Sequence, residues 1–356
     1  MLRTEKLNKR LDAFSLREIS LVVQPGDYYV LLGRSGAGKT QLLELICGLT
    51  PPDSGEVFLN GENITHKKVQ HREIGLVFQD FALFPHFSVK DNIMYPLKIK
   101  GIPLAEKVRR VQRVAEEMNI RHLLLRMPGS LSSGEQQRVA LARTLVTDPK
   151  ILLLDEPMGS IDASLRDSIR RMLRRLNRNG QTIVHVTHDF DEAISLANRV
   201  GVIHNGRIIQ EGTPLEVFNH PVNRFVARYA GIKNFFKVTF ITNYRNCSGL
   251  TERRTKLKMP KGEYPSSGLL IIGSSEVLLS REGVPGMQMN NIHGRIDDIV
   301  PSATGYEITV NAGDYFYADI THREMEENHF VTGENVIISF RPEALRLVGE
   351  TDNRNN

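Results

Sequence analysis

The sequence has few cysteines and no long apolar run, and each absence excludes a class of protein. Its 356 residues include only Cys47 and Cys247, which form neither a disulfide framework nor a metal-binding spacing. No apolar run approaches the ~18 residues that a helix needs to span a bilayer. The N-terminus from Met1 to Lys6 lacks the apolar core of a signal peptide. We therefore expect a cytoplasmic protein that works at a membrane only through a partner.

Charge narrows the choice of ligands without naming one. Charged residues make up 24% and hydrophobic residues 40% of the chain, which is ordinary for a globular protein long enough for two or three domains. The net charge of +5 and the pI near 9.1 suit anionic ligands. Much of the excess recurs at helical spacing, which is more typical of a solvated helix face than of a nucleic-acid site. These residues are Arg170, Arg171, Arg174, Arg175 and Arg178.

A glycine-rich stretch carries the first chemical signal. It reads Gly33, Arg34, Ser35, Gly36, Ala37, Gly38, Lys39, Thr40 and follows the pattern of a glycine, four residues and Gly-Lys-Ser/Thr. The β-rich run 28–32 precedes it and the helical run 41–46 follows, which is the context that the phosphate-loop motif needs. Its N–H groups would face phosphate oxygens, Lys39 would reach the outer phosphates, and the Thr40 hydroxyl would hold Mg²⁺. The alternative is a strand–helix turn without a ligand.

The surrounding pattern predicts a mainly parallel sheet with a helical insertion. Residues from about 84 to 147 read as helices, with an amphipathic segment at 104–118 and another at 134–147. Apolar strands then return at 151–155 and 182–186, separated by a long helix that ends near Asn179. Strands alternating with helices are typical of an α/β core.

Two carboxylates end one of these strands. Asp155 can hold Mg²⁺ through water, and Glu156 can face the γ-phosphate and polarise the attacking water. An exposed acidic turn is the alternative, but α/β sheets bind ligands at the carboxyl ends of their strands. Gln79 follows another strand, where its amide can touch both Mg²⁺ and water. His188 follows a third and can hydrogen-bond the γ-phosphate. Taken singly, Gln79 is explained equally well as a turn residue and His188 as a neighbour of a helix cap.

The segment 131–138, Leu-Ser-Ser-Gly-Glu-Gln-Gln-Arg, completes the set. Together with the order of the other motifs, it resembles the signature sequence of ABC ATPases, over residues 1 to about 230. The resemblance also takes in the loop Gly159-Ser160-Ile161-Asp162. It implies an α/β P-loop NTPase (RecA-like) core with the ABC helical subdomain and β-subdomain. It also implies head-to-tail pairing of two copies, with each ATP between one phosphate loop and the other signature.

In that arrangement four residues of one chain contact the ATP held by the other. They are Ser132, Ser133, Gly134 and Glu135. The start of the helix that opens at Gly134 offers N–H groups as a second anion site.

Three positions depart from the family pattern. Ser133 replaces the first signature glycine, which we expect to narrow the backbone geometry or to weaken closure. Glu135 replaces a common glutamine, a change often seen in importer cassettes. Leu11 holds the position of the usual aromatic residue that stacks on adenine, and Phe14 is the nearest ring. Phe14 is either a core residue or the stacking residue.

After about Gly231 the composition shifts to short strand-like runs punctuated by glycine, proline and asparagine. This predicts a small all-β domain, which we expect to be a barrel. The resemblance to ABC cassettes implies a regulatory barrel of the OB- or TOBE-like type. An internal echo between 271–279 and 338–347 indicates two similar half-modules. We therefore expect a nucleotide-binding domain at 1–230, with its helical subdomain at about 84–147. A regulatory β-domain at 231–350 and a frayed tail at 351–356 follow.

A cassette with such a tail, and with Arg341-Pro342-Glu343 near its end, resembles importer subunits. Such cassettes serve sugars, polyamines, ferric iron, sulfate and molybdate or tungstate. The segments 43–46, 83–86 and 133–143 resemble the molybdate/tungstate group best. The resemblance implies ATP and Mg²⁺ as cofactors and no nucleic acid. The implied partners are a second copy, two membrane permease subunits and, indirectly, a solute-binding protein.

The implied location is the cytoplasmic face of the membrane, where residues 78–86 and the helical insertion form a groove for a permease helix.

In the molybdate/tungstate group the tail can bind the oxyanion and lock the cassettes apart. Arg295, Ser302, Thr304 and Arg323 are candidates for this role, although a surface barrel scatters such residues in any case. An importer of sulfate, ferric iron, polyamine or sugar is one alternative. A non-transport cassette acting on DNA or ribosomes is another. The short helical insertion and the single cassette argue against that class.

Overall fold

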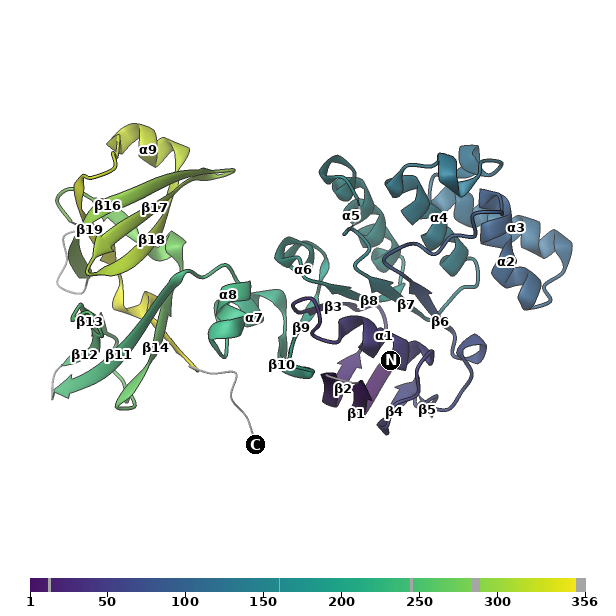
Figure 1. The fold of residues 1–356 in the computed structure, drawn as a ribbon, viewed down its shortest axis with the longest axis horizontal. Helices are drawn as coiled ribbons and strands as arrows, with labels where there is room; N and C mark the ends of the chain where they lie inside the picture. The colour runs from purple at the N-terminus through teal and green to yellow at the C-terminus, as the bar shows by residue number, and fades with distance from the viewer. Residues whose placement is uncertain (12–13, 160, 244–245, 284–288, 350–356) are drawn as a thin grey trace. The chain divides into compact units, whose positions relative to one another are not determined.

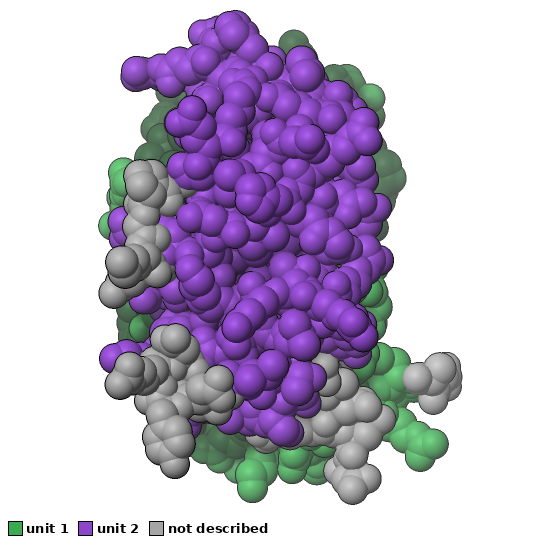
Figure 2. Space-filling model, turned by 90° about the vertical axis from the view of Figure 1, so that its left-hand side faces the viewer, with its two compact units in different colours: residues 1–217 green, residues 218–356 purple. Residues whose placement is uncertain are grey.

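The computed structural model describes residues 1–11, 14–159, 161–243, 246–283 and 289–349. Two expectations from the sequence, on Ser160 and on the tail at 351–356, therefore lie outside the described residues. The chain divides into two compact units, Met1–Val217 and Phe218–Asn356, which Figure 2 colours separately. Each unit has its own hydrophobic core and is described by itself.

A six-stranded sheet in the order β10-β9-β3-β8-β7-β6 forms the centre of the first unit (Figure 1). Its strands are β3 (Tyr28–Leu32), β6 (Ile74–Val77), β7 (Ile151–Asp155), β8 (Thr182–Thr187), β9 (Arg199–His204) and β10 (Arg207–Gly212). The first five run parallel and β10 pairs antiparallel with β9. Every residue of β3, β7 and β8 is buried, as expected for parallel strands covered on both faces.

A second, antiparallel sheet in the order β2-β1-β4-β5 adds the β-subdomain. Its strands are β1 (Leu2–Leu11), β2 (Phe14–Val23), β4 (Ser54–Leu59) and β5 (Glu62–Asn63). Helix α1 (Lys39–Cys47) shares one apolar core with both sheets, because its buried Leu42, Leu43 and Ile46 pack with residues of β1, β2, β3 and β7. The first residue of α1 is thereby held at the end of β3.

The helical region expected from the sequence contains α2 (Val89–Ile99), α3 (Leu104–Glu117) and α4 (Ser133–Leu145). Short 3₁₀ turns lie at Arg121–Leu123 and Pro128–Ser130, and another lies at Val69–His71. Helix α5 (Ala163–Arg178) connects β7 to β8, and α6 (Phe190–Leu196) connects β8 to β9. The buried residues of α5 include Ile169, Met172 and Leu173. Its arginines are exposed or half-buried, which confirms the solvated face.

The second unit is built around two five-stranded antiparallel sheets. One has the order β13-β12-β11-β14-β20 and the other β15-β19-β16-β17-β18. The first comprises β11 (Asn234–Asn243), β12 (Asn246–Thr251), β13 (Lys256–Met259), β14 (Ser267–Ile272) and β20 (Arg346–Val348). The second comprises β15 (Leu278–Ser280), β16 (Asn290–Ser302), β17 (Gly305–Ala312), β18 (Asp314–Thr321) and β19 (Asn335–Phe340). The all-β expectation for this region is confirmed. Helices α8 (Arg224–Tyr229) and α9 (His322–Asn328) of this unit are additions that the sequence pattern did not predict, as is α7 (Pro214–Asn219), which spans the boundary between the units.

The internal echo of the sequence is a repeated strand, 3₁₀ turn and strand. In one copy β14 leads through Ser274–Glu276 into β15, and in the other β19 leads through Pro342–Ala344 into β20. The copies exchange partners, because β14 pairs with β20 and β15 pairs with β19. Each copy therefore begins in one sheet and ends in the other, which ties the sheets together around one core.

The contact boundary between the units falls after Val217, earlier than the expected change at residue 231. Ala227 on α8 packs with Leu269, Ile271 and Val348 of the second unit, so α8 joins the β-domain. Among the helices of the described residues, none combines the length and the apolar character needed to cross a bilayer.

Candidate active site

The phosphate loop runs from the end of β3 to the first residue of α1, as its sequence predicts. Gly36 and Gly38 adopt φ angles of 79° and 96°, a left-handed conformation that other residues rarely adopt. Gly38 is also enclosed, because a Cβ there would lie 2.7 Å from the ring of Phe14. At Gly33 a Cβ would lie 2.6 Å from Ile203 on β9. The glycines therefore let the loop pack closely against neighbouring strands.

Lys39 is folded onto its own loop. Its Nζ donates hydrogen bonds to the carbonyl oxygens of Gly33 at 2.9 Å and Arg34 at 3.2 Å. The same nitrogen lies 3.4 Å from Oε1 of Glu156, and the side chain is only 5% exposed. A largely buried ammonium group at ion-pair distance from the Glu156 carboxylate is suited to an additional anion, such as the outer phosphates of a nucleotide.

Thr40 and Asp155 meet beside this lysine. The Thr40 hydroxyl donates a hydrogen bond to Oδ1 of Asp155 at 3.2 Å, and Asp155 is 5% exposed. Burial raises the pKa of the Asp155 carboxyl above its ordinary value, although the bond from Thr40 opposes that rise. A hard oxygen pair of this kind, with a carboxylate that is costly to ionise alone, fits a divalent cation such as Mg²⁺.

Glu156 occupies the position between the phosphate loop and His188. Its Oε2 lies 3.2 Å from Nδ1 of His188, while its Oε1 faces Lys39. The backbone of Glu156 has φ 42°, and its N–H donates to the carbonyl of Val186 at 3.0 Å. A left-handed conformation in a residue other than glycine stores strain of the kind found at functional sites. The strand end thus directs this carboxylate into the site.

Gln79 and Glu156 both approach Gly159. A Cβ placed on Gly159 would lie 3.7 Å from Oε2 of Glu156 and 3.8 Å from Nε2 of Gln79. Both are ordinary contact distances, so the Glu156 carboxylate and the Gln79 amide both lie next to Gly159. The structure thus brings Lys39, Asp155 and Glu156 into one cluster at the carboxyl ends of neighbouring strands. Thr40, Gln79 and His188 complete that cluster.

The signature residues stand at the start of α4, in the helical region rather than at the phosphate loop (Figure 1). Ser132 is the N-cap of α4, and its hydroxyl accepts a hydrogen bond from the Glu135 N–H at 3.3 Å. Oε2 of Glu135 in turn accepts the Ser132 N–H at 2.8 Å and the Ser132 hydroxyl at 3.1 Å. This reciprocal capping box stabilises the helix start. It also places the Glu135 carboxylate on the N–H group of Ser132.

Helix α4 begins at Ser133, one residue earlier than the expected Gly134. Ser133 has no positive φ angle, so this position does not require glycine. Gly134 is the constrained residue, because it is buried and a Cβ there would lie 3.1 Å from Leu165 of α5. The departure of Ser133 from the family pattern therefore leaves the backbone of this chain unstrained.

Leu11 and Phe14, the two candidates near the adenine position, end β1 and begin β2. Both are half-buried. Phe14 packs against the apolar core and against Gly38 of the phosphate loop. This packing explains an aromatic residue at position 14 without any contact to adenine.

Sequence reasoning missed the residues that hold the segment after Gln79. The Arg143 guanidinium donates to the carbonyls of Phe81 at 2.9 Å and Ala82 at 2.6 Å, where both residues have positive φ. Asn92, fully buried, hydrogen-bonds the N–H of Phe84 and three carbonyls in the stretch 84–88. The segment is thereby tied to α2 and α4. In the sequence, the only indication of these bonds was an asparagine that follows closely on a run of aromatic residues.

A second missed group lies beneath His188. The Tyr28 hydroxyl is 3.1 Å from Nδ1 of His185, and Nε2 of His185 is 3.1 Å from Oε2 of Glu192. Burial raises the pKa of the Glu192 carboxyl, but the His185 ring, with smaller contributions from Thr187 and Arg170, outweighs burial and leaves the pKa below its ordinary value. Glu192 belongs to α6, whose N-cap Asp189 directly follows His188. This polar cluster therefore supports the turn that carries His188.

The four candidate anion-binding residues of the tail do not form one site. Ser302 and Thr304 line the same small cleft. Arg295 donates to the carbonyl of Gly333 at 2.9 Å, and exposed Arg323 pairs with Glu327 at 2.7 Å.

The fold and the cluster define a P-loop NTPase with an ABC helical region. Residues 16–159 match the ABC transporter family. The chain is 38% identical to the molybdate/tungstate import ATP-binding protein of Pyrococcus horikoshii, over 98% of this chain and 99% of that protein. It is 35% identical to the spermidine/putrescine import ATP-binding protein of Nitrosomonas eutropha, over 95% of each chain.

A dimeric ATP-binding cassette solved in a post-hydrolysis state with ADP and phosphate is 28% identical, with a TM-score of 0.55. That match covers 60% of this chain and 99% of that one. The chain therefore belongs to the ABC transporter family, as an ATP-binding subunit of the import type and hence an ATPase. The expected family and fold class are confirmed.

Proposed function

We propose that the cluster around Glu156 hydrolyses ATP to drive import of molybdate or tungstate. The observation that carries the catalytic part is the position of one carboxylate between Lys39 Nζ, at 3.4 Å, and His188 Nδ1, at 3.2 Å. Glu156 accepts a proton from the attacking water as general base. Lys39 leaves its carbonyl partners for the outer phosphates, and His188 donates to the γ-phosphate.

Thr40, Gln79 and Asp155 are the residues that would hold Mg²⁺. When bound, the cation neutralises charge on the phosphate oxygens. Burial raises the pKa of the Asp155 carboxyl, and a bound cation would stabilise its ionised form. The phosphate-loop N–H groups of residues 33–40 bind the phosphate chain, and Gln79 orients the water.

The nucleotide site is completed by a second copy of the chain. Ser132, Ser133, Gly134 and Glu135 of the partner approach the γ-phosphate, where the start of α4 offers N–H groups. The capping box supports this role, because it fixes the helix start before the partner arrives. Two copies act beneath two membrane permease subunits at the cytoplasmic face, with residues 78–86 and the helical insertion forming the docking groove. A solute-binding protein delivers the cargo to the permease.

Similarity over nearly the whole chain, second unit included, supports molybdate or tungstate as the cargo. A polyamine is the second candidate, supported by a match of similar extent. The two differ in sign of charge, so one experiment separates them. The chain is reconstituted in proteoliposomes with its permease subunits and a solute-binding protein, and ATP hydrolysis is measured.

Molybdate or tungstate at micromolar concentration should stimulate hydrolysis several-fold, and spermidine should not. Stimulation by spermidine alone would transfer the cargo to the polyamine class, and stimulation by sulfate alone would assign a different oxyanion. Capture of the chain on ribosomes rather than with a membrane protein would contradict an import role altogether.

A further inference from the structure

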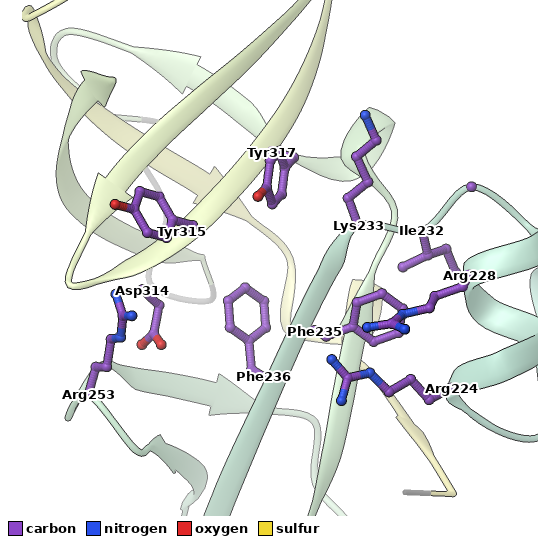
Figure 3. A pocket seen from close by; sticks show the side chains of 11 residues that line it. Arg224, Arg228, Ile232, Lys233, Phe235, Phe236, Arg253, Asp314, Tyr315 and Tyr317 are labelled. Carbon is purple, nitrogen blue, oxygen red and sulfur yellow. The ribbon is translucent and has the colours of Figure 1, made fainter. Parts of the chain in front are cut away.

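A basic, aromatic-lined cleft of about 690 Å³ lies entirely within the second unit. Figure 3 shows Arg224 and Arg228 of α8 along one side and Tyr315 and Tyr317 of β18 along the other, with Phe236 of β11 between them. None of these residues has a role in the nucleotide site. The cleft therefore needs its own explanation.

The two arginines are held without a carboxylate. Their guanidinium carbons lie 5.3 Å and 5.8 Å from the ring centroid of Phe235, for Arg224 and Arg228 respectively. Among the described residues no carboxylate stands at ion-pair distance from either, and Nε of Arg224 is buried without a hydrogen-bond partner. A pair of stacked guanidinium groups with free donors is a ready receptor for phosphate or carboxylate oxygens.

The walls of the cleft are fixed in place before any ligand binds. Asn234, fully buried, donates to the carbonyl of Tyr317 at 2.9 Å and accepts its N–H at 2.8 Å. This exchange joins β11 to β18. On the far side the Arg253 guanidinium donates to the carbonyl of Gly313 at 2.7 Å and lies 5.6 Å from the ring centroid of Tyr315. Preorganised walls lower the entropic cost of binding.

The electrostatic balance of the cleft favours an anion. Lys233 and Arg253 add two more positive charges, although Lys233 is paired with Glu307 at 2.6 Å. Of the described residues that line the cleft, Asp314 is the only acid. Its carboxylate accepts the Thr251 hydroxyl at 2.5 Å. The lining is therefore net positive, and its single acid is partly satisfied by a neighbouring hydroxyl.

Size and ring content decide the class of anion. A volume of about 690 Å³ falls in the range of about 300–1,000 Å³ typical of organic-ligand pockets, and is larger than one tetrahedral oxyanion needs. Tyr315 is 41% exposed, so the part of its ring that Arg253 does not cover is available for stacking. We propose that the cleft binds an aromatic phosphomonoester of nucleotide size, with its phosphate on Arg224 and Arg228 and its ring against Tyr315 and Tyr317.

Equilibrium dialysis of the full chain with AMP tests this proposal. The assay uses the Lys39→Ala variant, so that binding at the phosphate loop is weakened. AMP should bind at one site per chain. The double substitution Arg224→Gln/Arg228→Gln should weaken binding by about 10–100-fold, as expected when charge-assisted hydrogen bonds are lost. Arg323→Gln is the control, because it removes one positive charge from an exposed side chain of the same unit that lies outside the cleft.

A second variant separates loss of AMP binding from loss of folding. Tyr315→Ala alters an exposed ring, and should weaken AMP while leaving the weaker binding of inorganic phosphate unchanged. Absence of AMP binding at millimolar concentration, or equal binding by the arginine variant and its control, would overturn the proposal. Equal affinity for phosphate or molybdate would make the cleft a bare oxyanion site. Binding of a poly-glutamate peptide but not of AMP would make it a polypeptide-docking surface. Both outcomes contradict the assignment.

Discussion

His188 and Glu156 stand 3.2 Å apart, Nδ1 to Oε2, although they come from the ends of different parallel strands. Glu156 is 15% exposed at its side chain and His188 is 56% exposed. The carboxylate is therefore held inside the site while the imidazole is largely exposed. In the mechanism we propose, the buried carboxylate acts on the attacking water and the exposed imidazole binds the γ-phosphate.

Glu156→Gln should separate ATP binding from hydrolysis. The amide keeps the shape of the side chain but cannot take the proton of the attacking water. ATP hydrolysis should fall by about 10²–10⁴-fold, the usual contribution of a general base, while nucleotide affinity is retained. Steady-state phosphate release and nucleotide binding are measured side by side. Glu73→Gln is the control, since Glu73 only pairs with exposed Lys150. Turnover near the wild-type rate would remove Glu156 from this role.

Asp155→Asn should have opposite effects on stability and on activity. The folded-state pKa of Asp155 is raised by burial, so this group favours the folded chain while it is protonated. That contribution is lost as pH rises through the raised pKa. Without nucleotide at pH 8, the asparagine variant should therefore melt at the same temperature as wild type or higher. ATP hydrolysis should fall by about 10²–10³-fold, because a cation ligand is lost.

Calorimetry checks this prediction with and without Mg²⁺ and ATP. Mg²⁺ and ATP together should raise the melting temperature of the wild type, and they should raise that of the variant much less. The prediction would be contradicted by a variant that, without nucleotide, melts below the wild type at pH 8 but at the same temperature as the wild type at pH 4. Such a result would mean that the ionised, buried Asp155 carboxylate does not destabilise the fold.

The two adjacent signature positions should respond differently to substitution. Ser133→Gly restores the family residue at an unstrained position, and ATP hydrolysis should change by less than about threefold, the scale of an exposed surface substitution. Gly134→Ala places a Cβ 3.1 Å from Leu165. Either the Leu165 side chain or the start of α4 must then move by a few tenths of an ångström. We expect hydrolysis to drop by about tenfold, because small displacements at a site are costly. A large gain from Ser133→Gly would show that this serine does limit closure.

Glu192→Gln should destabilise the chain in a pH-dependent way. The lowered pKa of Glu192 means that its ionised form stabilises the fold above the ordinary carboxyl pKa. That stability is lost as pH falls through the lowered value. At pH 7 the variant should lose roughly 1–3 kcal/mol of unfolding free energy, the cost of a broken buried polar contact. The loss should shrink below pH about 4. Denaturant titrations at the two pH values measure it, and an equal loss at both would contradict the role of the charge.

The sequence predicted the parts of the site that rest on local pattern. The phosphate loop, the strand ending in Asp155 and the start of α4 near Gly134 follow from glycine spacing, apolar runs and capping residues, and the structure has those elements at the expected places. The all-β unit followed in the same way from period-two runs, and even its exchanged half-modules left a trace in the echo of 271–279 and 338–347.

What the sequence did not predict depends on contacts between distant residues. Arg143 reaches back about sixty positions to the carbonyls of Phe81 and Ala82, and no local pattern announces that bond. The joining of α8 to the β-domain likewise depends on the packing of Ala227 against β14 and β20. The cleft between Arg224 and Tyr315 assembles residues that are unremarkable in sequence, because only the pairing of strands brings them together.

Mixing two inactive variants tests most directly whether each ATP site is shared between two copies. Lys39→Ala disables the phosphate loop, and Ser132→Arg blocks the signature, with melting curves confirming that both fold. In a head-to-tail pair of one of each, one site retains an intact loop and an intact signature. Hydrolysis should therefore recover to roughly a quarter of the wild-type rate on mixing, given random pairing of subunits. A mixture as inactive as its components would place the whole catalytic site within a single chain and contradict the account.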